Sequence, residues 1–191
     1  MTEATEIRKP SELQESRLRQ MAWQLNDLTM DLKTPADLAP ILRELNNKLE
    51  AMSWARMMLG ALVLNLSKLQ EILEHYGKDI QTLPTEIRDD LNGIKQKIKK
   101  KEIYAYRNTY IAHAFLEEKV EDKKMKRPLS LDEATTRLRA IIDEGLAPPM
   151  ENVHAFCRWV YESGDQKCVV NVIHTTVSTL EKQLGGLGRR T

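Results

Sequence analysis

Leucine and other apolar residues recur every three or four positions along most of this chain, and this spacing constrains the fold more than any other feature. The clearest run covers residues 11–32, whose apolar positions share one helical face: Leu13, Leu18, Met21, Ala22, Leu25, Leu28 and Leu32. The 8 glycines and 7 prolines cluster between such runs instead of punctuating the chain at short intervals, as they do in many-stranded β proteins. The pattern predicts an all-α fold.

The same spacing predicts further helices beyond Pro35 and Pro40, which mark a break or a helix start. From residue 38 the pattern fits one long helix, or two helices that break near residues 46–53, with Gly77 beyond the end. Later helices are expected at 85–98, from 103, at 130–143 behind a Ser130/Glu133 capping box, at 149–161 and at 168–184. We therefore predict a bundle of six or seven helices around one long central helix.

The runs also predict how the chain is organised along its length. Residues 11–184 are expected to form a single helical domain, which 191 residues are enough to fill with one core. Residues 1–10 are expected to be disordered or loosely packed, and residues 185–191 to form a frayed basic tail. The charged stretch 117–128 is expected to be an exposed, solvated loop that could lie over a cleft.

Composition narrows the class of protein. The formal net charge is +1, which excludes a protein that binds nucleic acid through a wholly basic surface and leaves local patches open. The chain has no apolar stretch long enough to cross a bilayer, its polar N-terminus lacks the core of a signal peptide, and its two cysteines cannot build a disulfide framework. The expected location is therefore the cytoplasm, with no membrane partner.

The segment 104–115 contains the side chains best suited to bind a phosphate and transfer a proton. It places Arg107 and Asn108 among three tyrosines and ahead of His113, so a permanent cation, an amide and an imidazole that titrates near neutral pH stand close in sequence. Such groups could hold a phosphate and move a proton. A histidine packed in the core of a bundle is the plainer alternative.

This segment resembles the HEPN superfamily (higher eukaryotes and prokaryotes nucleotide-binding domains), helical bundles with an arginine, a polar residue and a histidine four to six intervening positions later. The matching residues are Arg107, Asn108 and His113, and the likeness extends by arrangement over residues 36–145. Among its branches the abortive-infection and toxin-associated type is the most similar. The resemblance implies a metal-independent endoribonuclease without cofactors, acting as a toxin or phage-defence effector with a separate antitoxin or regulatory protein. Members that only bind nucleotides or partner proteins are the alternative that the resemblance also implies.

In such an enzyme the RNA 2′-hydroxyl attacks its neighbouring phosphate. His113 would be the general base or acid, Arg107 would stabilise charge on the phosphate oxygens, and Asn108 would orient Arg107 or donate to the phosphate. Six positions along a helix turn a side chain by about 240° and advance it by ~9 Å, so the arginine and histidine are not neighbours on one straight helix. A homodimer that shares the two groups across one cleft resolves this, as the resemblance also implies.

Other residues have both a functional and an ordinary interpretation. Tyr104, Tyr110, Lys97, Lys99, Lys100 and Lys101 are candidate RNA-binding residues, and the lysines are equally expected as a solvated helix end. Phe115 stands where toxins silenced by adenylylation often carry a tyrosine, so that form of control is not expected. His154, Cys157, Cys168 and His174 lack the spacing of a zinc finger, and we predict no metal site.

Overall fold

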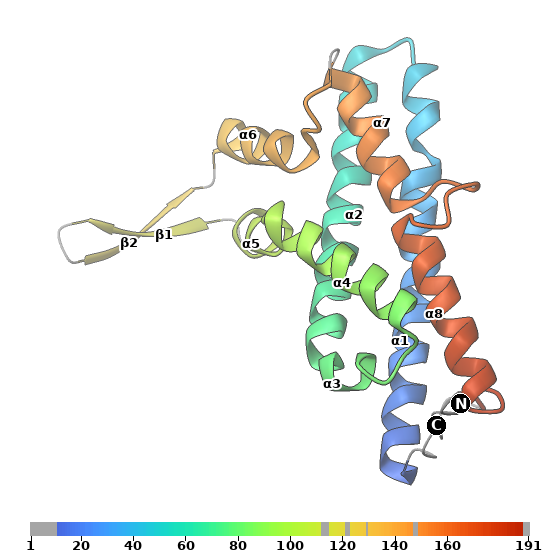
Figure 1. Ribbon diagram of the computed structural model, residues 1–191. Helices are drawn as coiled ribbons and strands as arrows, with labels where there is room; N and C mark the ends of the chain where they lie inside the picture. The colour runs from blue at the N-terminus through green and yellow to red at the C-terminus, as the bar shows by residue number, and fades with distance from the viewer. Residues whose placement is uncertain (1–10, 112–114, 121–122, 129, 147–148, 189–191) are drawn as a thin grey trace.

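The computed structural model describes residues 11–111, 115–120, 123–128, 130–146 and 149–188, and these form an all-α bundle with one β-hairpin, as the spacing of apolar residues predicts apart from the hairpin (Figure 1). Six helices have twelve residues or more: α1 (Glu12–Asp37), α2 (Lys48–His75), α4 (Thr85–Lys100), α6 (Leu131–Ile142), α7 (Pro149–Val160) and α8 (Val169–Gln183). Shorter elements join them: η1 (Ala39–Arg43), α3 (Gly77–Ile80), α5 (Ile103–Tyr106), η2 (Arg107–Ile111), β1 (Phe115–Val120) and β2 (Lys123–Pro128). Residues 1–10 and 189–191, for which disorder and fraying were expected, lie outside the described residues.

The core lies between α1, α2 and α8. In Figure 1 α1 and α2 run side by side in opposite directions, with α8 packed along α1 and α4 crossing in front. The apolar stripe of α1 faces α2 and α8, and Met21, Leu25 and Leu32 are completely buried. Burial of each such side chain contributes about 1.5–3 kcal/mol, so this stripe contributes strongly to the stability of the bundle.

The region of Pro35 and Pro40 differs in detail from the expected break. Helix α1 continues through Pro35 and ends at Asp37, and α2 begins only at Lys48, capped by the Asn47 side chain, which accepts from the amides of Leu49 and Glu50. Of the two alternatives left open by the sequence, the structure therefore has the version with a separate segment before the long helix, since η1 occupies residues 39–43.

A side chain of α2 compensates for the proline inside α1. Proline has no N–H, so Pro35 cannot donate to the carbonyl of Asp31 four residues earlier. Asn65 on α2 donates from Nδ2 to that carbonyl at 3.1 Å, and the asparagine is only 7% exposed. This contact lets the helix pass the proline without leaving a part-buried carbonyl unsatisfied.

The predicted loop at 117–128 is wrong, because most of this stretch forms an antiparallel hairpin. Strands β1 and β2 pair from Phe115 opposite Pro128 to Val120 opposite Lys123, and Figure 1 shows the ribbon standing away from the bundle. Val120 is the only β-branched residue in the two strands, so the sequence carries almost no strand signal. At the base Arg127 holds the hairpin to α6 by donating to both carboxylate oxygens of Glu133, at 3.0 and 3.1 Å.

A tight turn sets the direction of the segment that carries the predicted site. Between α4 and α5, Glu102 adopts a left-handed backbone conformation with φ of 54°, which is unusual for a residue with a side chain. The chain then makes one α-helical turn, α5, and continues into η2, a π-helical turn that begins at Arg107. Turns of this wide type are frequent at functional sites.

Candidate functional site

Arg107 is the first residue of η2, and one nitrogen of its guanidinium, Nη1, is bound to two described side chains. Its Nη1 donates to Oε1 of Glu71 on α2 at 3.2 Å and to Oδ1 of Asn108 at 3.1 Å. The ring of Tyr104 lies beneath the guanidinium, 5.6 Å from Cζ to the ring centroid. Within the described part of the chain, Nε and Nη2 have no hydrogen-bond acceptor, so one edge of the guanidinium is free to bind an anion.

His113 lies outside the described residues, together with its neighbours 112 and 114. Its role as general base or acid therefore stays a prediction. Arg107 and Asn108 are half-buried, so both side chains are in reach of solvent.

The tyrosines of the segment separate onto two sides. Tyr104 packs beneath Arg107, whereas Tyr106 and Tyr110 stack on each other with their ring centroids 5.1 Å apart and line a pocket of about 790 Å³. We call this the α4–α6 pocket, because α4, α5, η2, the hairpin base and α6 surround it. Burial raises the pKa of the Tyr106 hydroxyl, with a smaller contribution from Tyr110.

The four candidate lysines have three different surroundings. Lys97 and Lys101 both pair with Glu144, at 3.5 and 3.0 Å, and Lys101 also donates to the carbonyl of Ile141 at 2.7 Å. Lys99 pairs with Glu74 on α2 at 3.0 Å. Lys100 lines the α4–α6 pocket, is exposed, and forms no ion pair with any described residue. The four therefore do not form one basic surface.

The paired lysines lower the pKa values of their carboxylates. Burial raises the pKa of Glu144, but the hydrogen bonds and charges of Lys101 and Lys97 outweigh it, and the pKa is lowered. The hydrogen bond from Lys99 is the main cause of the lowered pKa of Glu74. These pairs join the C-terminal part of α4 to α2 and to the segment that follows α6, so three of the four candidate lysines have carboxylate partners within the fold.

The Arg107 side of the segment adjoins a second hollow that sequence reasoning missed. Glu71 lines a groove of about 560 Å³ between α1 and α2 together with Asp27, Asp31, Lys68 and His75. His75 is exposed, lies one helical turn from Glu71 and lines the same groove. Glu71 and His75 are 36 and 32 positions before Arg107 in the chain, so no local motif could have linked them to it.

The candidate metal ligands considered from the sequence remain: His154, Cys157, Cys168 and His174. Cys157 and Cys168 are both buried, and burial raises the pKa of the Cys157 thiol to about 12. In the part of the chain that the structure describes, no three His, Cys, Asp or Glu side chains are grouped as metal ligands. Among the same residues no helix has both the length and the apolar character needed to span a membrane.

Comparisons with protein-family models, with curated proteins and with solved structures return no match for this chain.

Proposed function

We propose that this chain is a HEPN-type, metal-independent endoribonuclease. The observation that carries the proposal is the guanidinium of Arg107, oriented by Asn108 and Glu71 through one nitrogen while its other edge stays free of described acceptors. A planar pair of N–H donors without a described acceptor, on an arginine six positions before a histidine in the sequence, suits a phosphodiester, because arginine binds two phosphate oxygens at once.

In the proposed reaction Arg107 binds the scissile phosphate and His113 takes the proton of the adjacent 2′-hydroxyl. The 2′-oxygen then attacks phosphorus, the bond to the 5′-oxygen breaks, and an acid returns a proton to that leaving oxygen. The products are a 2′,3′-cyclic phosphate and a 5′-hydroxyl. DNA lacks the 2′-hydroxyl, so the activity is restricted to RNA.

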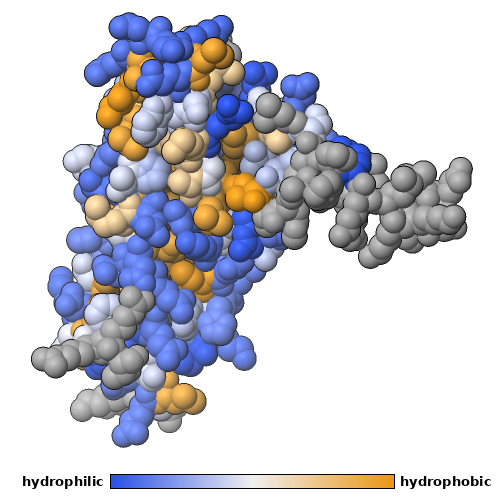
Figure 2. Space-filling model, turned by 180° about the vertical axis from the view of Figure 1, so that it is seen from behind, coloured by the Kyte–Doolittle hydropathy of each residue, from blue (hydrophilic) through white to orange (hydrophobic). Residues whose placement is uncertain are grey.

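The exposed face of α2 supports a homodimer. Leu49, Met57, Gly60, Leu64 and Glu71 follow at steps of eight, three, four and seven residues, which places them on one side of the helix. Leu49 is 78% exposed and Met57 64% exposed, and a Cβ added to Gly60 would meet nothing within 4 Å. Figure 2 includes hydrophobic surface at the end of the bundle where α2 begins. A second copy on this stripe would bring the two Arg107 side chains toward one cleft.

One observation favours a second candidate, a non-catalytic module that binds a nucleotide or a protein partner. Glu71 pairs with Arg107, and a carboxylate on the guanidinium competes with an incoming phosphate. On this alternative the ion pair is part of the fold, and RNA is not cleaved. The role of a toxin or defence effector with a separate antitoxin belongs to the first candidate.

The experiment incubates the purified protein with single-stranded RNA in EDTA, alongside Arg107→Ala, Asn108→Ala and Arg158→Ala. Arg158 is an exposed arginine of α7, away from the α2 stripe, and serves as the matched control. The proposal expects cleavage by wild type and Arg158→Ala, a loss of about a hundredfold or more in Arg107→Ala, and an intermediate loss in Asn108→Ala. Equal cleavage by all four proteins, or none by any, rejects it and favours the second candidate.

A further inference from the structure

The α4–α6 pocket lies on the opposite side of the 104–110 segment from the contact between Arg107 and Glu71. Tyr106, Thr109 and Tyr110 line the pocket, whereas Arg107 turns toward α2. The pocket and the proposed cleavage site therefore share one wall, a single helical turn whose width with side chains is about 10 Å. A polynucleotide bound at Arg107 has to continue somewhere beyond this wall.

The charged side chains deep in the pocket are already paired. Five basic and four acidic residues line it, and Glu144 is bound by Lys97 and Lys101 while Glu133 is bound by Arg127. The hydrogen bond from Arg127 is the main reason that the pKa of Glu133 is lowered. These pairs leave the interior close to neutral.

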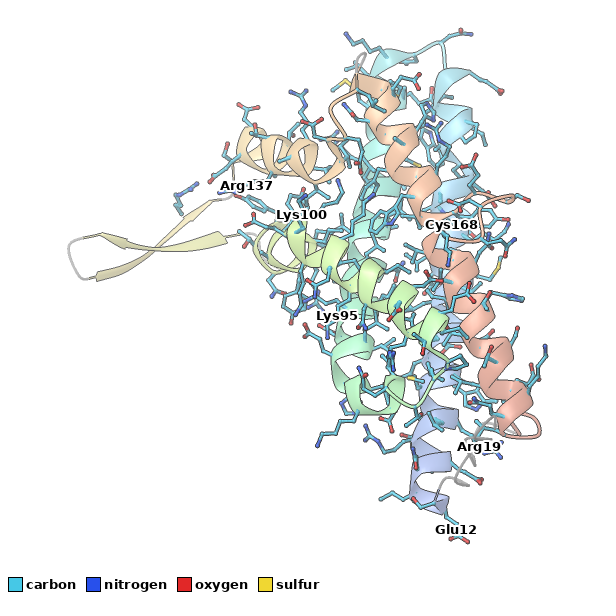
Figure 3. All side chains as sticks on the ribbon, viewed as in Figure 1. Glu12, Arg19, Lys95, Lys100, Arg137 and Cys168 are labelled. Carbon is cyan, nitrogen blue, oxygen red and sulfur yellow. The ribbon has the colours of Figure 1, made fainter. Side chains whose placement is uncertain are left out.

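Two basic side chains at the opening are different. Lys100 at the end of α4 has no ion-pair partner among the described residues. Arg137 on α6 has one described ion pair, a 3.9 Å contact with Glu102 in which both side chains are well exposed, and its charge also helps to lower the pKa of Glu133. Figure 3 shows Lys100 and Arg137 on the facing sides of α4 and α6. Together they present two cations to an anion that enters between the helices.

The wall of the pocket offers aromatic surface beside small residues. The stacked rings of Tyr106 and Tyr110 are half-buried, and Ala105, Thr109 and Ala140 leave room next to them. Single-stranded nucleic acid is bound by this combination of aromatic rings for the bases and cations for the backbone. The volume of about 790 Å³ falls in the range of pockets that hold one nucleotide-sized group.

We infer that the α4–α6 pocket is a subsite for one nucleotide of single-stranded RNA, flanking the cleavage site. Its base stacks on Tyr106 and Tyr110, and its phosphates are bound by Lys100 and Arg137. The inference rests on the proposed function for its substrate, RNA, and does not depend on cleavage. It gives a role to the two cations at the opening: Lys100 has no ion pair with a described residue and Arg137 has an exposed one at 3.9 Å, while closer carboxylates bind the other basic residues around the pocket.

The test measures binding of a single-stranded RNA with 2′-O-methyl sugars, which the proposed chemistry cannot cleave, by fluorescence anisotropy over a series of salt concentrations. The double variant Lys100→Gln/Arg137→Gln is compared with Arg139→Gln/Lys182→Gln, which removes the same two charges from exposed positions outside the pocket. We expect the pocket variant to weaken binding about tenfold and to lower the salt slope by ~0.7 for each phosphate that is no longer bound. The control variant, Arg139→Gln/Lys182→Gln, is expected to keep the affinity and the salt slope of wild type. Equal losses of affinity in the two double variants overturn the inference.

A second pair of variants separates stacking from charge. Tyr110→Ala removes a ring and is expected to weaken binding about fivefold or more, whereas Tyr110→Phe keeps the ring and the affinity. Circular dichroism verifies that both remain folded. Equal affinity of Tyr110→Ala and wild type overturns the subsite.

Adenosine monophosphate as a competitor distinguishes a nucleotide within RNA from a free one. Weak competition supports the RNA subsite. The subsite is overturned if the monophosphate binds tightly, if this binding depends on the pocket, and if the pocket variant still binds RNA as wild type does. If the protein cleaves RNA and the pocket variants bind RNA as tightly as wild type, only the subsite is rejected. If RNA binding depends on the pocket but no RNA is cleaved, only the ribonuclease proposal is rejected.

Discussion

Glu71 accepts a hydrogen bond from Nη1 of Arg107 at 3.2 Å, which joins the long helix α2 to the first residue of η2. The carboxylate is 45% exposed and the guanidinium 26%, so water reaches the pair and screens it. An exposed ion pair of this kind is worth about 0.2–1 kcal/mol. The pair therefore orients the guanidinium and competes only weakly with an incoming phosphate. The phosphate can bind Nε and Nη2, which have no acceptor among the described residues, or displace the carboxylate.

Substitution Glu71→Gln tests this competition. The amide keeps the size of the side chain and removes its charge, so binding of uncleavable RNA should tighten by about two- to fivefold, the factor that corresponds to an exposed ion pair. The matched control is Glu74→Gln, since Glu74 also lies on α2 and pairs with Lys99. Weaker binding by Glu71→Gln than by wild type would contradict competition and assign Glu71 the role of positioning Arg107.

The homodimer is tested on the exposed stripe of α2. Met57→Glu places a charge in the proposed interface and should convert a dimer to a monomer in sedimentation velocity, with loss of RNA cleavage. Met30→Glu is the control, because Met30 is 60% exposed on α1 and does not belong to the stripe. A monomeric wild type, or a dimer that persists in Met57→Glu, is the result that the proposed interface does not allow.

The contact of Asn65 with the Asp31 carbonyl should contribute measurably to stability. Asn65→Ala leaves a part-buried carbonyl without a donor and should lower the free energy of unfolding by about 1–3 kcal/mol in urea. In a Pro35→Ala background the restored N–H can bind the same carbonyl, so Asn65→Ala should then cost less. Additive effects of the two substitutions would show that Asn65 acts independently of the proline. Asn92→Ala, at an exposed position of α4, serves as the control.

Glu144 should make stability depend on pH in the acid range. Its pKa is lowered in the folded state from the ordinary 4.5, so its contribution is complete above pH 4.5 and is lost as the pH falls through the folded-state pKa. Glu144→Gln should therefore lower stability by about 1 kcal/mol at neutral pH. This difference from wild type should shrink on acidification below pH 4.5, as followed by thermal unfolding. A difference that stays constant throughout the acid range would contradict the pairing of Glu144 with Lys97 and Lys101.

The helices could be predicted because their cause is local. The stripe that buries Leu18, Leu25 and Leu32 repeats with the period of the helix, and the capping box at Ser130 marks the start of α6 in the sequence itself. The passage of α1 through Pro35 could not be predicted in this way, because the donor that permits it is Asn65 on another helix.

The hairpin could not be predicted for a different reason. Its two strands follow each other closely in the chain, but they contain one β-branched residue and so carry almost no strand propensity. The surroundings of Arg107 depend on non-local contacts. The sequence singled out Arg107 and Asn108 from a short motif, and in the structure Nη1 of Arg107 donates to Oδ1 of Asn108. It could not indicate Glu71, or that Lys97, Lys99 and Lys101 are committed to carboxylates on other elements, since those contacts join residues 25 or more positions apart.

Analysis of the RNA ends formed in EDTA tests the central claim most directly. The account predicts 2′,3′-cyclic phosphate and 5′-hydroxyl ends from wild type, and a rate that falls by about 10²–10⁴ in His113→Ala. His75→Ala and His174→Ala, which replace exposed histidines, should cleave as wild type does. Ends of another kind, or cleavage that depends on His75 and not on His113, would contradict the assignment of Arg107 and His113 as the reacting pair.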